Sequence, residues 1–506
     1  MLFNSYVFLF AFLPVALCGF FVACAFGEKF ASVWLVGASL VFYGWWNPGF
    51  LPVLIVSVAF NYGMSQIIDR ATRGRELLLA LAIAGDIGAL VYYKYLVAIV
   101  GFLHDWGATG ISVAHITLPL GISFFTFTQI GYLVDVAQGV AKDRGLRRYL
   151  LFVTFFPHLI AGPILHNREV MPQFGVAATW RPSGMNLAVG ATIFVMGLLK
   201  KCILADPLAA VAAPGFADPT HQALFAAWHA ALAYSLQLYF DFSGYSDMAI
   251  GLARMFNITF PQNFNSPYKA VCVIEYWQRW HMTLTRYLNL YLYNPVALAV
   301  TRRRMARGKG VNRKALATLD GFAMLTVWPT MFTMILAGIW HGAGFQFLVF
   351  GALHGFYLVV NHAWRIFGPR RPEGGDSVYA HTGKVALTYL CVLVGAVFFR
   401  ASSCGAAVHL LASMLGAHGM ESAVFSLRGV ARDVGALVCL YVIVWFMPNT
   451  QEIMRAYEPV LRRVPAGAFP FAVWHPTWRW AIVTGLGATL GVLAIGGTTE
   501  FLYFQF

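Results

Sequence analysis

Long apolar runs follow one another along most of the chain, each about as long as a membrane-spanning helix. The runs are continuous and do not alternate with polar residues, so they predict helices rather than the strands of a membrane barrel. Some are short or polar enough to be re-entrant or interfacial, and we expect about eleven to thirteen true crossings. The candidate spans are 4–26, 31–48, 51–68, 78–104, 116–137, 148–166, 184–203, 223–240, 243–257, 321–340, 345–363, 384–400, 434–448 and 480–497.

Composition agrees with this pattern, because 59% of the 506 residues are hydrophobic and only 11% are charged. A soluble domain would carry about a quarter charged residues. The prediction is an all-α, polytopic transmembrane bundle, since lipid requires every spanning backbone group to bond within its own helix. No repeat, low-complexity tract or soluble domain interrupts the chain, which predicts a single membrane-embedded domain over residues 1–506. The seven scattered cysteines form no CxxC pair and are interpreted as small buried apolar residues, not as disulfides or a metal site.

The net charge of +14 comes from basic residues that cluster in the loops between apolar runs. This is the positive-inside pattern of a bacterial inner-membrane protein, and it argues against a nucleic-acid partner. If all basic loops are cytoplasmic, three spans precede the first of them and the N-terminus is periplasmic. Residues 1–26 lack a basic n-region and a cleavage site, so they are expected to form a retained first span. The basic loops are Arg70, Arg73 and Arg75; Lys142, Arg144, Arg147 and Arg148; Arg302, Arg303, Arg304, Arg307, Lys309, Arg313 and Lys314; Arg365, Arg370 and Arg371; and Arg455, Arg462 and Arg463.

Two carboxylates lie in one polar stretch, LYFDFSGYSD at 238–247, between two apolar runs. Buried acids need charged or hydrogen-bonding partners. Asp241 and Asp247 can belong to a polar network that clamps helices or can line a substrate cavity, and Gly244 permits the backbone to bend between them. The clamp fits Asp241 better, whereas both interpretations stay open for Asp247.

A turn-rich segment that contains Asn263 leads into the sequence EYWQRWH at 275–281. A helix over 273–285 would place Glu275 and Arg279 on one face, and Trp280 and His281 on another. Glu275 and Arg279 are expected to form an intrahelical ion pair, which leaves His281 to face a cavity. A lone histidine is more often a satisfied core residue, but ionisable groups at membrane depth usually mark function.

A second histidine ends the almost wholly apolar run 321–340, in the sequence IWHGA. Imidazole titrates near neutral pH and can move a proton or activate a hydroxyl group. The glycines around Trp340 and His341 let a ligand or another chain segment approach the backbone closely. His354 is a weaker candidate for function and is interpreted as a packing histidine, and His362 is expected to be interfacial.

Proline and glycine also interrupt the apolar segments at 117–125 and 155–163. Proline frees a helix carbonyl, which membrane proteins tolerate where protein or water satisfies it. Broken helices around a central cavity also occur in transporters. A transporter or flippase therefore stays a rival to an enzyme, although inverted repeats, which that class predicts, are not evident. A purely structural membrane subunit that recruits a periplasmic enzyme would need neither histidine.

Several motifs in one order resemble a known family. They are MLFNSYVFLFAFLP, LPLGISFFTFTQIGYLVDV, FFPHLIAGPI, QLYFDFSGYSDMAIGLA, NFNSPY, EYWQRWHMTLT and GIWHGAGFQFLVFGALHG, all within residues 1–363. Together they resemble the membrane-bound O-acyltransferase (MBOAT) family of the bacterial polysaccharide type, closest to the membrane subunit of alginate O-acetyltransferase. The chain is more distantly similar to the D-alanyl transferase of teichoic acids.

The resemblance implies a bundle with kinked and re-entrant helices around a central tunnel, and a motif-bearing core at about 116–363. It also implies that His341 is catalytic and that His281 lies at the same site. The substrate- or cavity-lining residues would be Trp280, Trp340, Asp241, Asp247, Asn263, Arg279 and Glu275. One stretch departs from the family: after RWH this chain continues with RYLNLYLYNP and the basic loop 302–314. The face that meets an acceptor or partner is therefore expected to differ from that of alginate-type proteins.

The chemistry implied by the resemblance is O-acetylation of an extracytoplasmic or exported polysaccharide, with cytoplasmic acetyl-CoA as the donor and no metal. His341 would act as general base, and His281 would orient the acceptor or the thioester carbonyl. The acetyl group would pass to a glycan, or to a periplasmic SGNH-type partner. Transfer from a carrier protein, as in D-alanyl transfer, is the alternative donor reaction.

Overall fold

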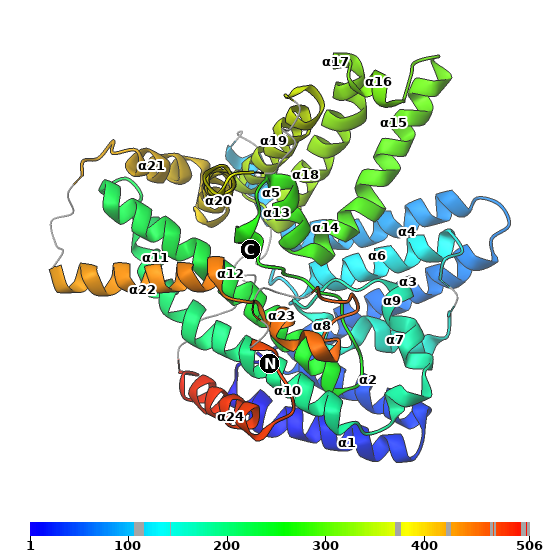
Figure 1. Cartoon of the computed structure of the whole chain (residues 1–506). Coiled ribbons are helices and arrows are strands. Elements are labelled where there is room, and N and C mark those ends of the chain that lie inside the picture. Colours follow the sequence, from blue (N-terminus) through cyan, green and yellow to red (C-terminus); the bar gives the residue numbers. More distant parts are fainter. Residues whose placement is uncertain are drawn as a thin grey trace. The chain divides into compact units, whose positions relative to one another are not determined.

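The computed structural model describes residues 1–105, 116–141, 143–369, 376–420, 427–465, 469, 472–496 and 502. These residues form helices joined by loops, and no strand occurs among them (Figure 1). Two compact units interleave along the chain. Unit 1 comprises Met1–Ile203, Asp241–Gln262 and Pro448–Gln505, and unit 2 comprises Leu204–Phe240 and Asn263–Met447. The expectation of a single membrane-embedded domain stays a prediction.

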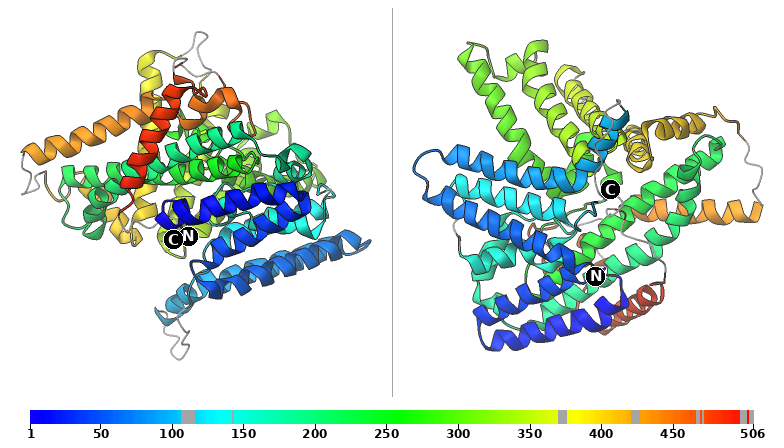
Figure 2. Two further views of the ribbon diagram at one scale, coloured as in Figure 1. Left: turned by 90° about the horizontal axis from the view of Figure 1, so that it is seen from below. Right: turned by 180° about the vertical axis from the view of Figure 1, so that it is seen from behind.

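Unit 1 is built from the N-terminal helices and two later segments of the chain (Figure 2). Its elements are η1 (Phe8–Phe12), α1 (Leu13–Ala25), α2 (Glu28–Gly44), η2 (Pro48–Phe50), α3 (Leu51–Arg70), α4 (Arg75–Leu90), η3 (Val91–Tyr95), α5 (Leu96–Asp105), α6 (Ile122–Ala137), α7 (Leu146–Thr154), α8 (Phe156–Leu159), α9 (Asn167–Val170), η4 (Met171–Gly175), η5 (Ala177–Trp180), α10 (Gly184–Leu199), most of η6 (Lys200–Ala205), the second part of α12 (Leu224–Met255), α23 (Thr450–Met454), η10 (Arg455–Tyr457) and α24 (Trp478–Leu493).

Unit 2 contains both histidine motifs. Its elements are α11 (Asp206–Ala217), the first part of α12, η7 (Pro267–Lys269), α13 (Val273–Arg279), α14 (Met282–Leu288), η8 (Asn289–Tyr293), α15 (Asn294–Ala306), α16 (Arg313–Leu316), α17 (Leu319–Phe322), η9 (Ala323–Val327), α18 (Trp328–His341), α19 (Phe345–Phe367), α20 (Val378–Arg400), α21 (Cys404–Met414) and α22 (Leu427–Phe446).

The described helices confirm a multi-pass membrane protein. Seven helical stretches are long and apolar enough to cross a membrane, or eight if the bent pair Val434–Phe446 and Thr450–Tyr457 counts as one span. The shorter helices α2, α6 and α24 have 17, 16 and 16 residues. The expected number of crossings, which includes such shorter helices, stays a prediction.

The helix α12 corrects one prediction. The sequence predicted two spans, 223–240 and 243–257, with a bend at Gly244, but α12 runs unbroken from Leu224 to Met255. A glycine inside a helix does not bend it unless the surroundings favour a bend, and here Gly244 packs against the backbone of a neighbouring helix. The polar residues around it therefore lie on a helix and not in a turn.

Four glycines bring α10 and α12 together within unit 1. Gly190 and Gly197 of α10 face Gly251 and Gly244 of α12. A Cβ on Gly197 would lie 2.7 Å from the backbone N of Met248, where no real Cβ is found. Small residues at such positions let two membrane helices approach closely, so that dispersion contacts between their backbones hold them together.

Replacing Gly197 with leucine is therefore expected to destabilise unit 1. The side chain would collide with the α12 backbone, and overpacking of this kind costs about 1–3 kcal/mol. The measurement is the thermal unfolding midpoint of the purified protein in detergent. Gly63→Leu is the matched control, because nothing lies within 4 Å of a Cβ at that position. Equal midpoints for the two variants would contradict this account of the packing.

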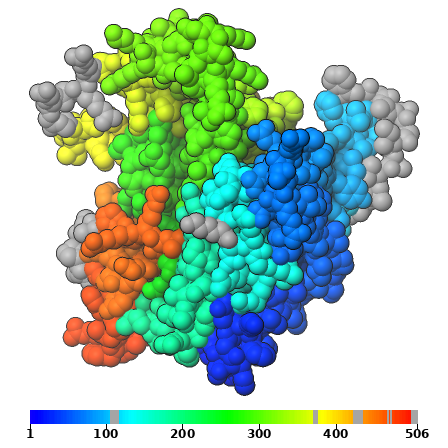
Figure 3. Space-filling view, turned by 90° about the vertical axis from the view of Figure 1, so that its right-hand side faces the viewer, coloured from blue at the N-terminus to red at the C-terminus, as the bar shows by residue number. Residues whose placement is uncertain are grey.

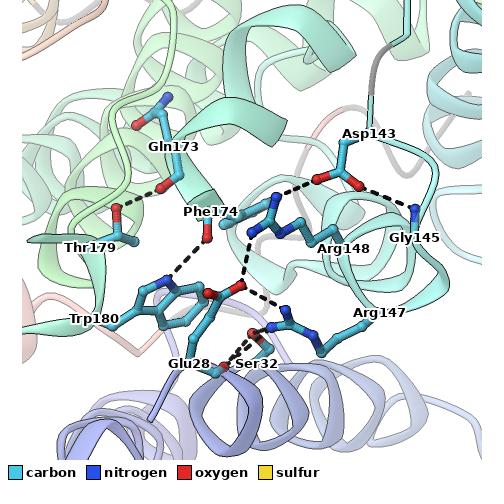
Figure 4. Close-up of polar contacts among 10 residues, drawn as sticks. All are labelled: Glu28, Ser32, Asp143, Gly145, Arg147, Arg148, Gln173, Phe174, Thr179 and Trp180. Carbon is cyan, nitrogen blue, oxygen red and sulfur yellow. Dashed lines mark hydrogen bonds and ion pairs between the residues drawn. The ribbon is translucent and has the colours of Figure 1, made fainter. Parts of the chain in front are cut away.

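Ion pairs join the basic loops of unit 1 at one end of its helices. Asp69, at the end of α3, pairs with Arg144 and Arg75. Glu28, at the start of α2, accepts hydrogen bonds from Arg147 at 2.7 Å and from Arg148 at 3.1 Å (Figure 4). The loops after α1, α3 and α6 therefore meet on one side, as the positive-inside scheme requires. Lys142, Arg370 and Arg371 lie outside the described residues.

The acid in this cluster is held ionised by its partners. Burial raises the pKa of Glu28, but the hydrogen bonds and charges of Arg147 and Arg148 outweigh burial and hold that pKa below its ordinary value. Arg148 also pairs with Asp143 in the loop itself (Figure 4). The two arginines thus bind the loop before α7 to the start of α2.

Candidate functional site

The helix that carries the first histidine breaks at that histidine. The expected helix over 273–285 is wrong, because α13 ends at Arg279 and α14 begins at Met282. His281 has φ 41° and ψ 51°, the left-handed region that residues other than glycine rarely occupy. Such conformations persist only where the surroundings hold them, and they cluster at functional sites.

The turn-rich segment before α13 forms backbone hydrogen bonds with the residues on both sides of the break. The backbone N–H of Met282 donates to the carbonyl of Asn263 at 2.9 Å, and the N–H of Asn265 donates to the carbonyl of Arg279 at 2.9 Å. These bonds satisfy backbone groups that a continuous helix would satisfy internally. The segment 263–265 therefore stabilises the interruption between α13 and α14 through backbone hydrogen bonds.

The side chain of Asn263 also fixes the state of the His281 ring. Its Oδ1 accepts hydrogen bonds from the backbone N–H of Thr283 at 3.3 Å and from the Thr283 hydroxyl at 2.8 Å. A backbone N–H can only donate, so the atom that faces it must be the amide oxygen. The same oxygen lies 3.0 Å from His281 Nδ1, which must then carry a proton. In the neutral ring, Nε2 is consequently the nitrogen with the lone pair.

The charged pair on α13 is local, as predicted. Arg279 donates to Glu275 Oε1 at 2.7 and 2.9 Å, and it also donates to the carbonyl of Asn265 at 3.2 Å. Glu275 in turn accepts from the backbone N–H of Val271 at 2.9 Å. The expected intrahelical ion pair is confirmed, and it fastens α13 to the segments on either side.

Trp280 lies in an aromatic stack beside His281. Its ring is nearly parallel to Tyr268, with centroids 6.4 Å apart, and to Tyr276, with centroids 5.8 Å apart. The Tyr268 hydroxyl donates to the carbonyl of Ser235 on α12 at 2.7 Å. Both Trp280 and His281 are buried.

His341 is the last residue of α18 and is buried among aromatic rings. Its ring lies 5.8 Å from Phe350 and 5.1 Å from Phe399, centroid to centroid. Trp340 beside it is buried as well. The glycines of this region serve close packing, because a Cβ on Gly338 would lie 2.9 Å from the Cα of Gly351 on α19.

Ring contacts connect His341 with the Trp280 stack inside unit 2. Phe350, which contacts His341, lies 4.6 Å from His354, and His354 lies 6.2 Å from Tyr276. His354 Nδ1 accepts a hydrogen bond from Trp277 Nε1 at 3.3 Å. His354 therefore has the contacts of a packing histidine, as the sequence suggested. The two histidine motifs are joined through a continuous set of aromatic rings.

The two acidic candidates lie in unit 1 and pair with adjacent lysines. Lys201 Nζ lies 2.5 Å from Asp241 Oδ1, and both side chains are 2% exposed. Lys200 Nζ lies 2.6 Å from Asp247 Oδ2, which also accepts from the hydroxyl of Thr450 at 2.7 Å. These contacts are those of a clamp between η6, α12 and α23. A cavity-lining role for the two acids stays a prediction.

A cavity of about 260 Å³ lies within unit 2, between α13, α14, η8, α18 and α19. It contains Thr285, one turn after His281, and Met334, two turns before His341. The Thr285 and Thr333 hydroxyls are buried and find no hydrogen-bond partner among the described residues. The lining residues are Ile274, Trp277, Gln278, Thr285, Leu288, Asn289, Tyr293, Thr330, Thr333, Met334, Leu358 and His362.

Sequence reasoning missed several of these residues. The adjacent lysines Lys200 and Lys201 stand at the end of an apolar run, and that contrast is a signal that could have paired them with the acids. The threonines of the cavity give no such signal, because threonine is common in membrane helices. Among the described residues, no group of three or more His, Cys, Asp or Glu side chains could hold a metal ion.

Comparison with known proteins adds independent information. Residues 122–370 match the model of the membrane-bound O-acyltransferase family. The peptidoglycan O-acetyltransferase of Helicobacter pylori is 37% identical over 456 residues, which cover 83% of this chain and 81% of that protein. The probable alginate O-acetylase AlgI of Pseudomonas aeruginosa is 33% identical over 556 residues, with both chains covered completely. The teichoic acid D-alanyltransferase of Bacillus subtilis is 28% identical over 236 residues, 46% of this chain and 56% of that protein.

Proposed function

The chain belongs to the membrane-bound O-acyltransferase family, and from that membership we propose that it moves acetyl groups from cytoplasmic acetyl-CoA to a polysaccharide outside the inner membrane. It is an O-acyltransferase of the alginate and peptidoglycan O-acetyltransferase type. The observation that carries the proposal is the cavity of about 260 Å³ between α13 and α14, which flank His281, and α18, which ends at His341. It offers a place for a flexible acyl-donor arm, with Thr285 one turn after His281 and Met334 two turns before His341 in its wall.

The reaction is a transfer of acetyl from sulfur to oxygen. The acceptor hydroxyl oxygen attacks the thioester carbonyl carbon, the carbon–sulfur bond breaks, and CoA leaves as a thiolate. His341 takes the hydroxyl proton as general base and returns it to the thiolate, a contribution typically worth about 10²–10⁴-fold. His281, with its proton on Nδ1, offers the lone pair of Nε2. It therefore orients the acceptor by accepting a hydrogen bond from a second hydroxyl group of the glycan, because the single proton of the attacking hydroxyl goes to His341; a lone pair cannot bind the thioester carbonyl.

The cavity in unit 2 suits the pantetheine arm of CoA. Its apolar wall, with Ile274, Leu288 and Leu358, would bury the methylene groups. Its hydroxyl and amide groups would bind the two amides of the arm, which need partners when buried. The unsatisfied hydroxyls of Thr285 and Thr333 are available for this. The anionic nucleotide part of CoA would remain at the basic cytoplasmic loops.

Replacing Thr333 with tryptophan is expected to fill this cavity. The KM for acetyl-CoA should rise roughly tenfold or more, which corresponds to about 1.4 kcal/mol of lost donor binding. Leu336→Trp is the matched control, because Leu336 lies on the same helix but does not line the cavity. Steady-state CoA release at varied donor concentration measures the effect. An unchanged KM in the Thr333 variant would place the donor elsewhere.

The direction of transfer follows from the expected topology. The ion pairs that gather the loops after α1, α3 and α6 support a common cytoplasmic side, with a periplasmic N-terminus in the bacterial inner membrane. The acetyl group would leave on the other side, to a glycan hydroxyl or to a periplasmic SGNH-type protein that passes it on.

The test is release of labelled CoA from acetyl-CoA by the purified protein in lipid nanodiscs, with and without periplasmic extract. Release by the folded protein is expected, and addition of acceptor should increase it. No release from protein that unfolds cooperatively would contradict acetyl-CoA as donor. An acyl group on a carrier protein is the second candidate, favoured by the similarity to the D-alanyltransferase. Turnover with an acylated carrier protein in the same assay would identify it.

A further inference from the structure

A second cavity lies in unit 1, and no residue of the histidine motifs lines it. The helices α3, α4 and α6 pack side by side (Figures 1 and 2), with α3 and α4 in blue beside α6 in cyan on the face shown in Figure 3. They enclose a cavity of about 410 Å³. It is lined by Pro52, Val53, Val56, Ser57, Phe60, Gly85, Asp86, Ala89, Tyr93, Ile122, Phe125 and Thr126.

One oxygen of a carboxyl group at this cavity receives no hydrogen bond among the described residues. Asp86 is 4% exposed, and its Oδ1 accepts from the Asn61 amide at 2.8 Å. The same amide nitrogen donates to the carbonyl of Ser57 at 3.0 Å. Asp86 Oδ2 and Asn61 Oδ1 are buried, and neither meets a partner among the described residues. Burying two acceptors without a donor costs free energy, and a bound molecule that supplies a donor would recover part of that cost.

The position along the helices indicates the depth of this site. Asp86 follows Arg75 by eleven residues, and Asn61 precedes Arg70 by nine. At 1.5 Å per residue, both lie about 14–17 Å from the basic ends of α3 and α4. That is near the middle of a hydrocarbon core of about 30 Å. A charged lipid headgroup does not reach this depth at reasonable cost, whereas an uncharged molecule dissolved in the membrane does and can supply the donor.

The cavity has an apolar entrance from the outer side of the helices. Val56 is 67% exposed and Phe60 is 39% exposed, and both line it. Apart from Ser57, Asp86, Tyr93 and Thr126, the lining is apolar. A ligand for this site therefore combines a hydrocarbon chain with one hydroxyl group.

We propose that this cavity binds a membrane-dissolved long-chain alcohol. The hydroxyl donates to Asp86 Oδ2, and the chain lies against Val53, Val56 and Phe125. All residues that line it belong to unit 1, and it shares none of them with the cavity in unit 2. The proposal does not depend on the function proposed above.

The probes are a photoreactive, alkyne-bearing hexadecanol and its methyl ether, in which a methyl group replaces the hydroxyl hydrogen so that the oxygen can no longer donate. The expected result is cross-linking of the alcohol to peptides of α3, α4 and α6 in the purified protein, with competition by unlabelled hexadecanol. The ether should label these peptides at least tenfold less. Mass spectrometry of the digested protein locates the label.

Variants distinguish specific binding in the cavity from non-specific labelling of the apolar surface of the helices. Val56→Trp fills the entrance and should reduce labelling at least tenfold, whereas Ile55→Trp, whose side chain does not line the cavity, should leave it unchanged. Asp86→Leu should abolish the preference for alcohol over ether. Thermal unfolding checks each variant, and Val56→Trp suffices if Asp86→Leu does not fold. Equal labelling by both probes, or labelling that Val56→Trp does not reduce, would overturn the proposal.

Discussion

Replacing His341 with alanine should lower acetyl transfer by about 10²–10⁴-fold while the protein stays folded. His341 is the one titratable residue in the sequence of α18, and the phenyl rings of Phe350 and Phe399 beside its imidazole cannot take a proton. His341→Gln should be equally inactive, because glutamine fills similar space and makes hydrogen bonds but is no base. Single-turnover release of CoA, with donor saturating, measures the loss.

The control for this experiment is His381→Ala, which removes an exposed histidine near the start of α20. It should keep full activity, and all three variants should show the unfolding midpoint of the wild type within a few degrees. Normal turnover in a folded His341→Ala protein would remove His341 from the chemistry. It would leave the fold and the family membership untouched, because neither depends on that side chain.

Local and periodic features were predictable from the sequence. The apolar runs predicted helices, and the apolar run 321–340 predicted the span that ends at His341. Glu275 and Arg279 are four residues apart on one helix, so their ion pair needs no tertiary information. Interactions of this range are determined by neighbours along the chain, and a sequence displays them directly.

Features that depend on distant partners were not predictable. The break at His281 depends on Asn263, eighteen residues earlier, whose backbone and side chain satisfy the groups that the break exposes. Gly244 offered a bend and serves instead as a contact point for α10. A continuous helix and a bent or broken helix have the same sequence, and therefore the same helix propensity and glycine content. Tertiary packing decides which of the two forms. The pairing of Lys201 with Asp241 is likewise a contact between segments forty residues apart.

Asn263→Leu is expected to reduce turnover by about 10²-fold, the usual cost of a misplaced catalytic geometry. Leucine has a similar volume but cannot accept from Thr283 or from His281 Nδ1, so the ring loses both its position and its preferred tautomer. Asn263→Asp should keep more activity, because a carboxylate oxygen accepts the same hydrogen bonds.

In the Asn263→Asp variant the added negative charge favours protonated imidazole, so the pKa of His281 should rise. Because the reaction needs His281 Nε2 without a proton, the acidic limb of the pH–rate profile should move to higher pH in the aspartate variant. A merely structural role for Asn263 would lower activity without moving that limb, and an unmoved limb in an active aspartate variant would exclude His281 from orienting the acceptor.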